Sequence, residues 1–206
     1  MRKGILAVVS GFSGAGKGTV IKALLEQHEG YALSVSATTR EPRPGELHGR
    51  EYYFIGKEEF EDMIREGQLL EYAQYVDHYY GTPRPFVEKK LAEGTDVLLE
   101  IELQGALQIR ERFPQAVLIF ITPPSIQALR ERLIGRGSET EEIINNRLKR
   151  ARVEARSMDQ YDYILVNDTV NECAEALHQT IQSVHRRSSM MKDRIEEIRR
   201  QAEEEL

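Results

Sequence analysis

The stretch Gly11-Phe12-Ser13-Gly14-Ala15-Gly16-Lys17-Gly18-Thr19 decides the fold predicted for this chain. It follows the apolar run from Ile5 to Val9, which is typical of a buried strand. The residues after it are apolar at helical spacing: Val20, Ile21, Leu24 and Leu25. A strand, a glycine-rich loop and a helix in this order form the setting of a phosphate-binding loop, because loop N–H groups and the helix N-terminus attract anionic oxygens. Lys17 adds a full positive charge.

The loop departs from the usual pattern at one position. Gly18 stands where a hydroxyl that holds Mg²⁺ is expected, and Thr19 follows one place later. The loop pattern therefore leaves the metal ligands open. The alternative, a glycine-rich turn without a ligand, is disfavoured by the strand and helix on either side of the loop.

Composition restricts the classes of protein. The 206 residues suffice for one large domain that buries roughly 70% of its unfolded surface. The single cysteine, Cys173, excludes an internal disulfide, and we expect a buried thiol in a reducing compartment. We find no signal-peptide pattern and no apolar run of membrane-spanning length, so we expect a cytoplasmic protein without a membrane partner. A net charge of −6 disfavours nucleic acid, and any anion site must come from local clusters.

The polar segment from Thr38 to Ile55 contains one such cluster. Arg40 and Arg43 are three residues apart, and the prolines beside them stiffen the segment. Guanidinium groups match the geometry of a phosphate, which makes this segment a candidate phosphate site. Two arginines in a polar loop are also common as solvated surface charge, and the segment alone leaves both interpretations open.

The same segment resembles the signature of guanylate kinases: Thr38-Thr39-Arg40, Arg43, Glu46, Gly49, Tyr52 and Phe54 stand at the spacing of that family. The similarity continues in order through residues 70–73, 79–82, 104–106, 135–137 and 166–168. It covers roughly residues 4 to 185. Several motifs in one order are much more specific than any one of them.

The resemblance implies an α/β fold, that of the P-loop nucleoside monophosphate kinases. We expect a parallel five-stranded core sheet with flanking helices from residues 1–33, 91–124 and 159–187. Continuous apolar strands such as Ala116 to Ile121 agree with a sheet covered on both faces. We also expect strands from Tyr31 to Ser36 and from Tyr161 to Val166, and a helix after Ser125 as its N-cap. A later helix has one apolar stripe that should pack on the core: Val170, Cys173, Leu177, Ile181 and Val184. A GMP-binding insertion would span 34–90 and a small lid 125–158. The charged helical tail 188–206 is either solvated or a contact to a second subunit, so a homo-oligomer is left open.

Glu71, in the predicted strand Leu69 to Tyr75, is the candidate for reading the base. Guanine presents two adjacent donors that one carboxylate can accept, whereas adenine presents an acceptor in the same place. Such a site can discriminate by about 10⁴-fold. The resemblance gives Glu71 this role, with the hydroxyls of Ser36 and Thr82 nearby. A solvent-facing carboxylate is the alternative.

The remaining acceptor residues follow from the family. Tyr52 and Tyr80 match its phosphate-binding tyrosines, which join Arg40 and Arg43 around the monophosphate. Aromatic packing is the alternative for each tyrosine.

Glu100 and Glu102 close the predicted strand Val97 to Glu102, and a period of two places them on one face. At the carboxyl end of a parallel strand they would orient Mg²⁺ or the sugar and base of the monophosphate. A structural salt bridge is the alternative for one of them.

The lid carries the candidate arginines for the donor. Arg136 and Arg147 match the lid arginines of guanylate kinases, and the family also has an arginine at the position of Arg132. On closure such groups would neutralise the transferring phosphoryl group. Asn167 falls where the family contacts adenine. We expect Arg150, Arg152 and Arg156 to form a solvated helix face.

The resemblance thus implies a kinase that transfers the γ-phosphoryl group of Mg-ATP to GMP or dGMP, with positioning and charge stabilisation in place of a general base. The candidate catalytic residues are Lys17, Arg40, Arg136 and Arg147. The candidate ATP-binding residues are Gly11, Phe12, Ser13, Gly14, Ala15, Gly16, Lys17, Gly18, Thr19, Arg132, Arg136 and Asn167. The candidate GMP-binding residues are Ser36, Arg40, Arg43, Tyr52, Glu71, Tyr80, Thr82, Glu100 and Glu102. The candidate Mg²⁺ ligands besides the phosphates are Thr19 and Glu100.

Two other functions compete with this one. An adenylate-type kinase shares Gly-Lys-Gly-Thr, but Thr-Thr-Arg and Glu71 argue against it. Guanylate-kinase-like modules of scaffold proteins bind peptides, but they typically have a degenerate phosphate loop. Here Lys17, Arg136 and Arg147 are all present.

Overall fold

A computed structural model of the chain describes residues 3–75, 77–135 and 140–205. Within them, five parallel strands form the central sheet in the order β2-β7-β1-β8-β9. Their bounds are β1 Leu6–Gly11, β2 Tyr31–Leu33, β7 Asp96–Glu100, β8 Val117–Thr122 and β9 Tyr163–Val166. The strand order runs outward on both sides of β1, so the phosphate loop leaves the middle of the sheet. The predicted parallel five-stranded core is confirmed.

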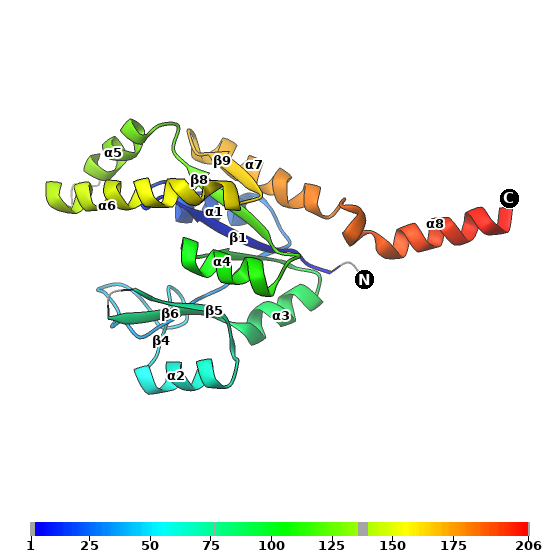
Figure 1. Cartoon of the computed structure of the whole chain (residues 1–206), viewed down its shortest axis with the longest axis horizontal. Helices are drawn as coiled ribbons and strands as arrows, with labels where there is room; N and C mark the ends of the chain where they lie inside the picture. The colour runs from blue at the N-terminus through cyan, green and yellow to red at the C-terminus, as the bar shows by residue number, and fades with distance from the viewer. Residues whose placement is uncertain (1–2, 76, 136–139, 206) are drawn as a thin grey trace.

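Helices cover this sheet on both faces (Figure 1). On one side, α1 (Lys17–Gln27) packs against α7 (Val170–Val184). The predicted apolar stripe of α7 is confirmed, and its Cys173 is a buried free thiol. On the other side, α4 (Leu103–Arg112) contacts both β1 and β5, and α3 (Arg84–Ala92) contacts β7. The helix α4 therefore lies between the core and the next unit.

Residues 34–90 build a second, four-stranded sheet in the order β4-β3-β6-β5. Its strands are β3 Ala37–Thr38, β4 Tyr53–Phe54, β5 Leu69–Tyr75 and β6 His78–Pro83, and α2 (Lys57–Arg65) packs on it. Phe60 of α2 is fully buried in a hydrophobic cluster separate from the main core. We call this unit the insertion.

Two helices follow β8 and form the unit that we call the lid. The first, α5, spans Ile126–Gly135, and the predicted cap is confirmed, because Ser125 Oγ accepts a hydrogen bond from the Ala128 N–H. The second, α6, spans Glu141–Glu154, with Thr140 as its N-cap, and runs into the 3₁₀ turn Ala155–Gln160. Arg136 lies outside the described residues.

Two strand boundaries differ from the predictions. β7 ends at Glu100, and Glu102 is the N-cap of α4, so the period of two no longer relates the two carboxylates. The chain leaves the sheet at Ile101, whose carbonyl accepts from Ser10 Oγ at 2.8 Å. The strand expected from Tyr31 to Ser36 ends at Leu33, and the chain enters the insertion there.

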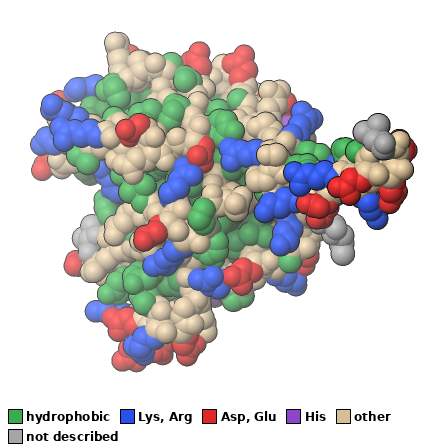
Figure 2. All heavy atoms as spheres, turned by 45° about the vertical axis from the view of Figure 1, so that its right-hand side comes forward, with side chains coloured by type: hydrophobic (Ala, Val, Ile, Leu, Met, Phe, Trp, Pro, Cys, Tyr) green, Lys and Arg blue, Asp and Glu red, His purple; other side chains and the backbone are tan. Residues whose placement is uncertain are grey.

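The tail is helical but lies away from the body (Figures 1 and 2). A 3₁₀ turn, Ser188–Met190, leads into α8, Lys192–Glu205, which has no buried residue along its length. Acidic and basic side chains cover it in Figure 2. Across the described residues, no helix combines the length and the apolar character that crossing a membrane requires.

Candidate active site

The phosphate loop is held by close backbone contacts. A Cβ atom on Gly11 would lie 2.1 Å from the carbonyl oxygen of Ile121 in the neighbouring strand, so only glycine fits. Gly16 takes a left-handed conformation, φ +89°, and forms the N-cap of α1. Lys17 is the first residue of the helix, and its ammonium donates to the carbonyls of Gly11 at 2.8 Å and Phe12 at 3.3 Å. A positive charge therefore lies over the loop at a helix N-terminus, where phosphates bind.

Side chains from other elements brace the same loop. The amide nitrogen of the buried Asn167 donates to the carbonyl of Ala15 at 2.7 Å. Arg132 of α5 donates to the carbonyl of Asn167 at 2.8 Å. Arg147 of α6 donates to Ser13 Oγ at 2.9 Å. The two described arginines that we predicted in the lid thus both reach the phosphate loop or its supports.

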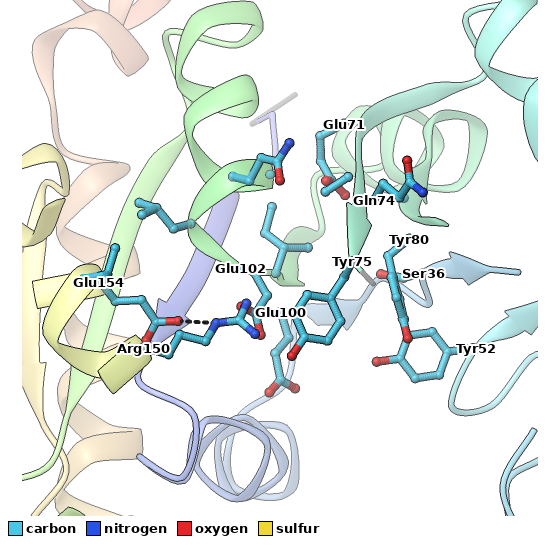
Figure 3. A pocket seen from close by; sticks show the side chains of 17 residues that line it. Ser36, Tyr52, Glu71, Gln74, Tyr75, Tyr80, Glu100, Glu102, Arg150 and Glu154 are labelled. Atoms are coloured by element: carbon cyan, nitrogen blue, oxygen red, sulfur yellow. Dashed lines mark hydrogen bonds and ion pairs between the residues drawn. The ribbon is translucent and has the colours of Figure 1, made fainter. Parts of the chain in front are cut away.

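A cavity of about 430 Å³ opens beside the loop, between the core, the insertion and the lid (Figure 3). Six predicted acceptor residues line it: Ser36, Tyr52, Glu71, Tyr80, Glu100 and Glu102. The lid contributes Arg150, Val153 and Glu154 to the same wall. The cavity therefore unites residues that are far apart in the sequence.

Glu71 is a buried residue in the wall of the cavity. Its side chain is only 3% exposed, and Thr82 Oγ1 donates to its Oε1 at 2.6 Å. Burial raises the pKa of Glu71 to about 7, against the lowering effect of Thr82 and of the Arg112 charge. Glu71 is thus a buried acceptor rather than a solvent-facing carboxylate, and Thr82 lies behind it as its hydrogen-bond donor.

Gly105, at the start of α4, decides how closely that helix approaches Glu71. A Cβ at this position would lie 2.4 Å from Glu71 Oε2. The sequence motif Gln104-Gly105-Ala106 marks this glycine, but we did not place it in the site. Its signal would have been a glycine inside an otherwise helical pattern.

Away from Glu71, the predicted acceptor residues form a cluster of one cation and two aromatic rings. Arg40 Cζ lies 5.5 Å from the centre of the Tyr52 ring, and that ring lies edge-on to Tyr80 at 6.0 Å. Burial acts against the charged form of Arg40, but hydrogen bonds and charge from Glu46 and Tyr80 raise its pKa overall. Glu46 also accepts from the backbone N–H of Arg43 at 2.8 Å. These contacts hold the guanidinium of Arg40 in place in the segment from Arg40 to Glu46.

Arg43 is placed differently from Arg40. Its side chain is exposed, whereas that of Arg40 is partly buried, and neither arginine is among the described residues that line the cavity. Its role at the phosphate stays a prediction.

Glu100 connects the two halves of the site. A Cβ at Gly18 would lie 3.5 Å from Glu100 Oε2, so the carboxylate faces the position where the loop lacks its hydroxyl. Desolvation and the nearby Glu102 raise the pKa of Glu100, and Lys17 lowers it. The charge of Glu100 in turn contributes to a raised pKa of Tyr52, after burial and Tyr80. Glu100 therefore interacts electrostatically with both Lys17 and Tyr52, although neither Lys17 nor Arg40 is among the described residues that line the cavity.

The donor set fits Mg²⁺. This ion prefers oxygen ligands and is usually bound by one or two carboxylates together with substrate phosphates. Glu100 offers such an oxygen beside the loop. Among the described residues, no group of three or more His, Cys, Asp or Glu side chains could hold a metal by itself. Thr19 and Glu100 both stay predicted protein ligands of Mg²⁺, which substrate phosphates would also hold.

The sequence prediction was wrong for Arg150. It was expected on a solvated face, but it pairs with Glu102 and Glu154, and its guanidinium lies 4.6 Å from the centre of the Tyr75 ring. Figure 3 shows these side chains together at one rim of the cavity. Glu102 thus takes part in a salt bridge, which was the alternative for one of the two carboxylates, and its role toward GMP stays a prediction. Glu154 was not singled out, although it is 8% exposed and burial raises its pKa.

Comparisons with known proteins agree with this geometry. The family model described as guanylate kinase matches residues 3–184. A guanylate kinase of Oceanobacillus iheyensis is 54% identical over 183 residues, 89% of each chain. One of Caldanaerobacter subterraneus is 48% identical over 201 residues, 98% of each chain. The crystal structure of guanylate kinase from Anaplasma phagocytophilum has a TM-score of 0.72 and 34% identity, and the match covers 88% of this chain and 86% of that one. The chain belongs to the guanylate kinase family.

Proposed function

We propose that this protein transfers the γ-phosphoryl group of Mg-ATP to GMP, and to dGMP, to form ADP and the nucleoside diphosphate. Family membership makes the protein a phosphotransferase. The observation that carries the choice of acceptor is the buried Glu71 carboxylate in the wall of a cavity that opens beside the phosphate loop.

The geometry of Glu71 supports guanine as its partner. Thr82 Oγ1 donates to Oε1, and α4 approaches Oε2 at Gly105. Each carboxylate oxygen has a second lone pair, and we propose that these accept from the ligand. Guanine offers two adjacent N–H donors that can face the Glu71 carboxylate. These donors would stabilise its ionised form, which burial alone disfavours. An acceptor nitrogen, as in adenine, would face a carboxylate without a proton between them. We therefore propose that Glu71 selects the base, with Ser36 in the wall of the same cavity.

The acceptor phosphate belongs at the cationic end. We propose that Arg40, Arg43, Tyr52 and Tyr80 fix it, because guanidinium and phenol donors match phosphate oxygens. A nucleoside monophosphate that spans from Glu71 to Arg40 would pass Glu100, whose carboxylate lies against Gly18, the residue after Lys17. Its phosphate would then lie where the γ-phosphate of ATP is held.

The donor phosphates belong on the loop from Gly11 to Thr19. We propose that Lys17 moves from its two carbonyl partners to the β- and γ-phosphates, and that Arg147 and Arg136 offset the charge that develops during transfer. Arg132 and Asn167 support the loop from behind, and the adenine contact of Asn167 remains part of the proposal. Thr19 or Glu100 would hold Mg²⁺ together with the phosphates, and the ion would supply positive charge that lowers the repulsion between the two nucleotides.

We propose the following division of labour: residues 34–90 close over GMP, residues 125–158 close over ATP, and the core 1–33, 91–124 and 159–187 carries both. The separate hydrophobic cluster of the insertion supports its movement as a unit. The tail 188–206 is assigned no part in the reaction. Since ATP and GMP are cytoplasmic metabolites, we propose the cytoplasm as the place of action.

Replacing Glu71 by Gln tests the acceptor. The amide keeps the shape but turns one acceptor into a donor, which leaves a buried mismatch with guanine. We expect kcat/KM for GMP to fall at least about 10²-fold, while the KM of ATP stays within about twofold. The measurement is a coupled ADP-release assay with GMP, dGMP, AMP and UMP. An unaltered preference for GMP in the Gln variant would reject Glu71 as the selecting group, and turnover of AMP by the unaltered protein would favour an adenylate-type kinase.

A further inference from the structure

Arg150 occupies a position that neither the phosphate loop nor the base pocket explains. It lies on α6 of the lid, yet it contacts three different units (Figure 3). Its Nη2 pairs with Glu102 at the start of α4, and its Nε donates to Glu154 of its own helix at 3.1 Å. The guanidinium also stacks over Tyr75 at the end of β5. These contacts join the core, the lid and the insertion at one point.

The same helix also reaches the donor site. Arg147 and Arg150 are three residues apart, so they lie on one face of α6. Arg147 donates to Ser13 in the phosphate loop, and Arg150 meets the rim of the acceptor cavity. A movement of α6 therefore changes the contacts at both nucleotide sites together.

The charges around Arg150 give it a second effect. Three carboxylates line this part of the cavity: Glu100, Glu102 and Glu154. Two of them, Glu102 and Glu154, pair with Arg150. An incoming monophosphate adds further negative charge. Arg150 is the cation that the described structure places against Glu102, so it lowers the repulsion that the acceptor meets.

We infer that Arg150 is a positioning residue for the acceptor nucleotide: it holds Glu102 and Tyr75 at the cavity rim and links them through α6 to the phosphate loop. The inference rests on the proposed function, since it concerns how GMP is received. Arg150 is not assigned contact with the reacting phosphates. Its planar group makes two directed contacts and one stacking contact, which a lysine ammonium cannot reproduce together.

The experiment compares Arg150→Ala with a matched control, Arg152→Ala, on the same helix. Arg152 is exposed and does not line the cavity among the described residues. Steady-state kinetics with GMP varied at saturating ATP, and the reverse, give separate KM values, and calorimetry gives the Kd of GMP. We expect Arg150→Ala to raise the KM and Kd of GMP about tenfold, which is within the range of couplings between contacting residues. The KM of ATP should change less than about threefold.

Two further variants separate positioning from general loss of structure. Arg150→Lys keeps the charge without the fork, so we expect it to restore only part of the GMP affinity. In a double-mutant cycle, Arg150→Ala should add less than about twofold once Glu102→Gln is present, because the partner is already neutral. Thermal melting checks that all variants are folded.

The outcomes distinguish a failure of the inference about Arg150 from a failure of the proposed function. If the unaltered protein turns over GMP and Arg150→Ala matches Arg152→Ala, the inference about Arg150 is wrong by itself. A tighter Kd for GMP in Arg150→Ala would also overturn it, because the Glu102 pair would then compete with the substrate. Additive effects in the cycle would reject the link through Glu102. No GMP turnover by the unaltered protein would overturn the proposed function, and the role of Arg150 with it.

Discussion

The phosphate loop and the base pocket differ in what they present to a ligand. The loop uses backbone groups from nine consecutive residues, and its neighbours Asn167 and Arg132 act mainly on its carbonyls. The pocket uses side chains from separate segments, with Glu71 from β5, Thr82 from β6 and a close approach of α4 at Gly105. The loop is thus specified locally, whereas the pocket depends on how units pack. We expect damage to the two regions to be separable.

Replacing Lys17 by Met should give the largest effect. The variant keeps the length of the side chain but removes the charge over the loop, where it would stabilise the transferring phosphoryl group. We expect kcat to fall about 10³-fold, as for the loss of a preorganised electrostatic group, with little change in thermal stability. Single-turnover kinetics measure the chemical step. If the variant kept more than a tenth of the wild-type kcat, the charge over the phosphate loop would not be needed for catalysis. The proposed contrast between the loop and the base pocket would then fail.

Replacing Gly105 by Ala should damage the pocket alone. The new Cβ would lie 2.4 Å from Glu71 Oε2, so either the carboxylate or α4 must shift. We expect the KM of GMP to rise about 10- to 100-fold, because a misplacement of about 1 Å can cost that much, while the Kd of ATP stays unchanged.

The matched control is Gly56→Ala, which has no neighbouring atom within 4 Å of the new Cβ and an ordinary φ of −67°. It should leave both substrates unaffected. Equal losses for GMP and ATP in Gly105→Ala would show that the pocket and the loop are not independent.

This difference also explains what could be predicted from the sequence. The loop was readable because the strand, the glycines and the helix are adjacent, and every strand of the core sheet was expected near its observed place. Glu71 was found through the family motif, and the structure adds its burial. The end of β7 was missed because the chain leaves the sheet at Ile101. The carbonyl of Ile101 accepts a hydrogen bond from Ser10, which is 91 residues away in the sequence.

Arg150 shows the limit of reading one helix by itself. Its spacing within α6 fits a solvated face, and nothing local indicates that Glu102 and Tyr75 come to meet it. Those contacts depend on how the lid, the core and the insertion are packed, which the helical pattern does not contain. Arg43 is the reverse case, since the motif places it in the site and the structure leaves its side chain exposed.

Replacing Glu100 by Gln tests the place where the two regions meet. The carboxylate faces Gly18, and we propose it as a protein ligand of Mg²⁺. We expect the Mg²⁺ concentration for half-maximal turnover to rise about tenfold, as for other losses around a metal site, because the neutral amide binds the ion less well. Thr19→Ala is the paired variant. A shift in Thr19→Ala without one in Glu100→Gln would move the metal ligand to Thr19 and return Glu100 to the acceptor side.

Replacing Glu71 by Gln should give the smallest effect when stability is measured without nucleotides, and its sign is opposite to the loss of activity. Burial raises the pKa of Glu71 from its ordinary value of 4.5 to about 7, so the folded state holds this proton more tightly than the unfolded chain does. The ionised carboxyl therefore costs no stability below pH 4.5, costs more as the pH rises, and has its full cost above pH 7. Gln carries no such cost.

We expect the melting temperature of Glu71→Gln to exceed that of the unaltered protein by about 2–4 °C at pH 8 for each kcal/mol relieved, and by much less at pH 5. Calorimetric scans at the two pH values measure this difference. An equal change at both pH values would mean that Glu71 keeps one protonation state between pH 5 and pH 8. The charge of the pocket would then be as constant in this range as that of the loop.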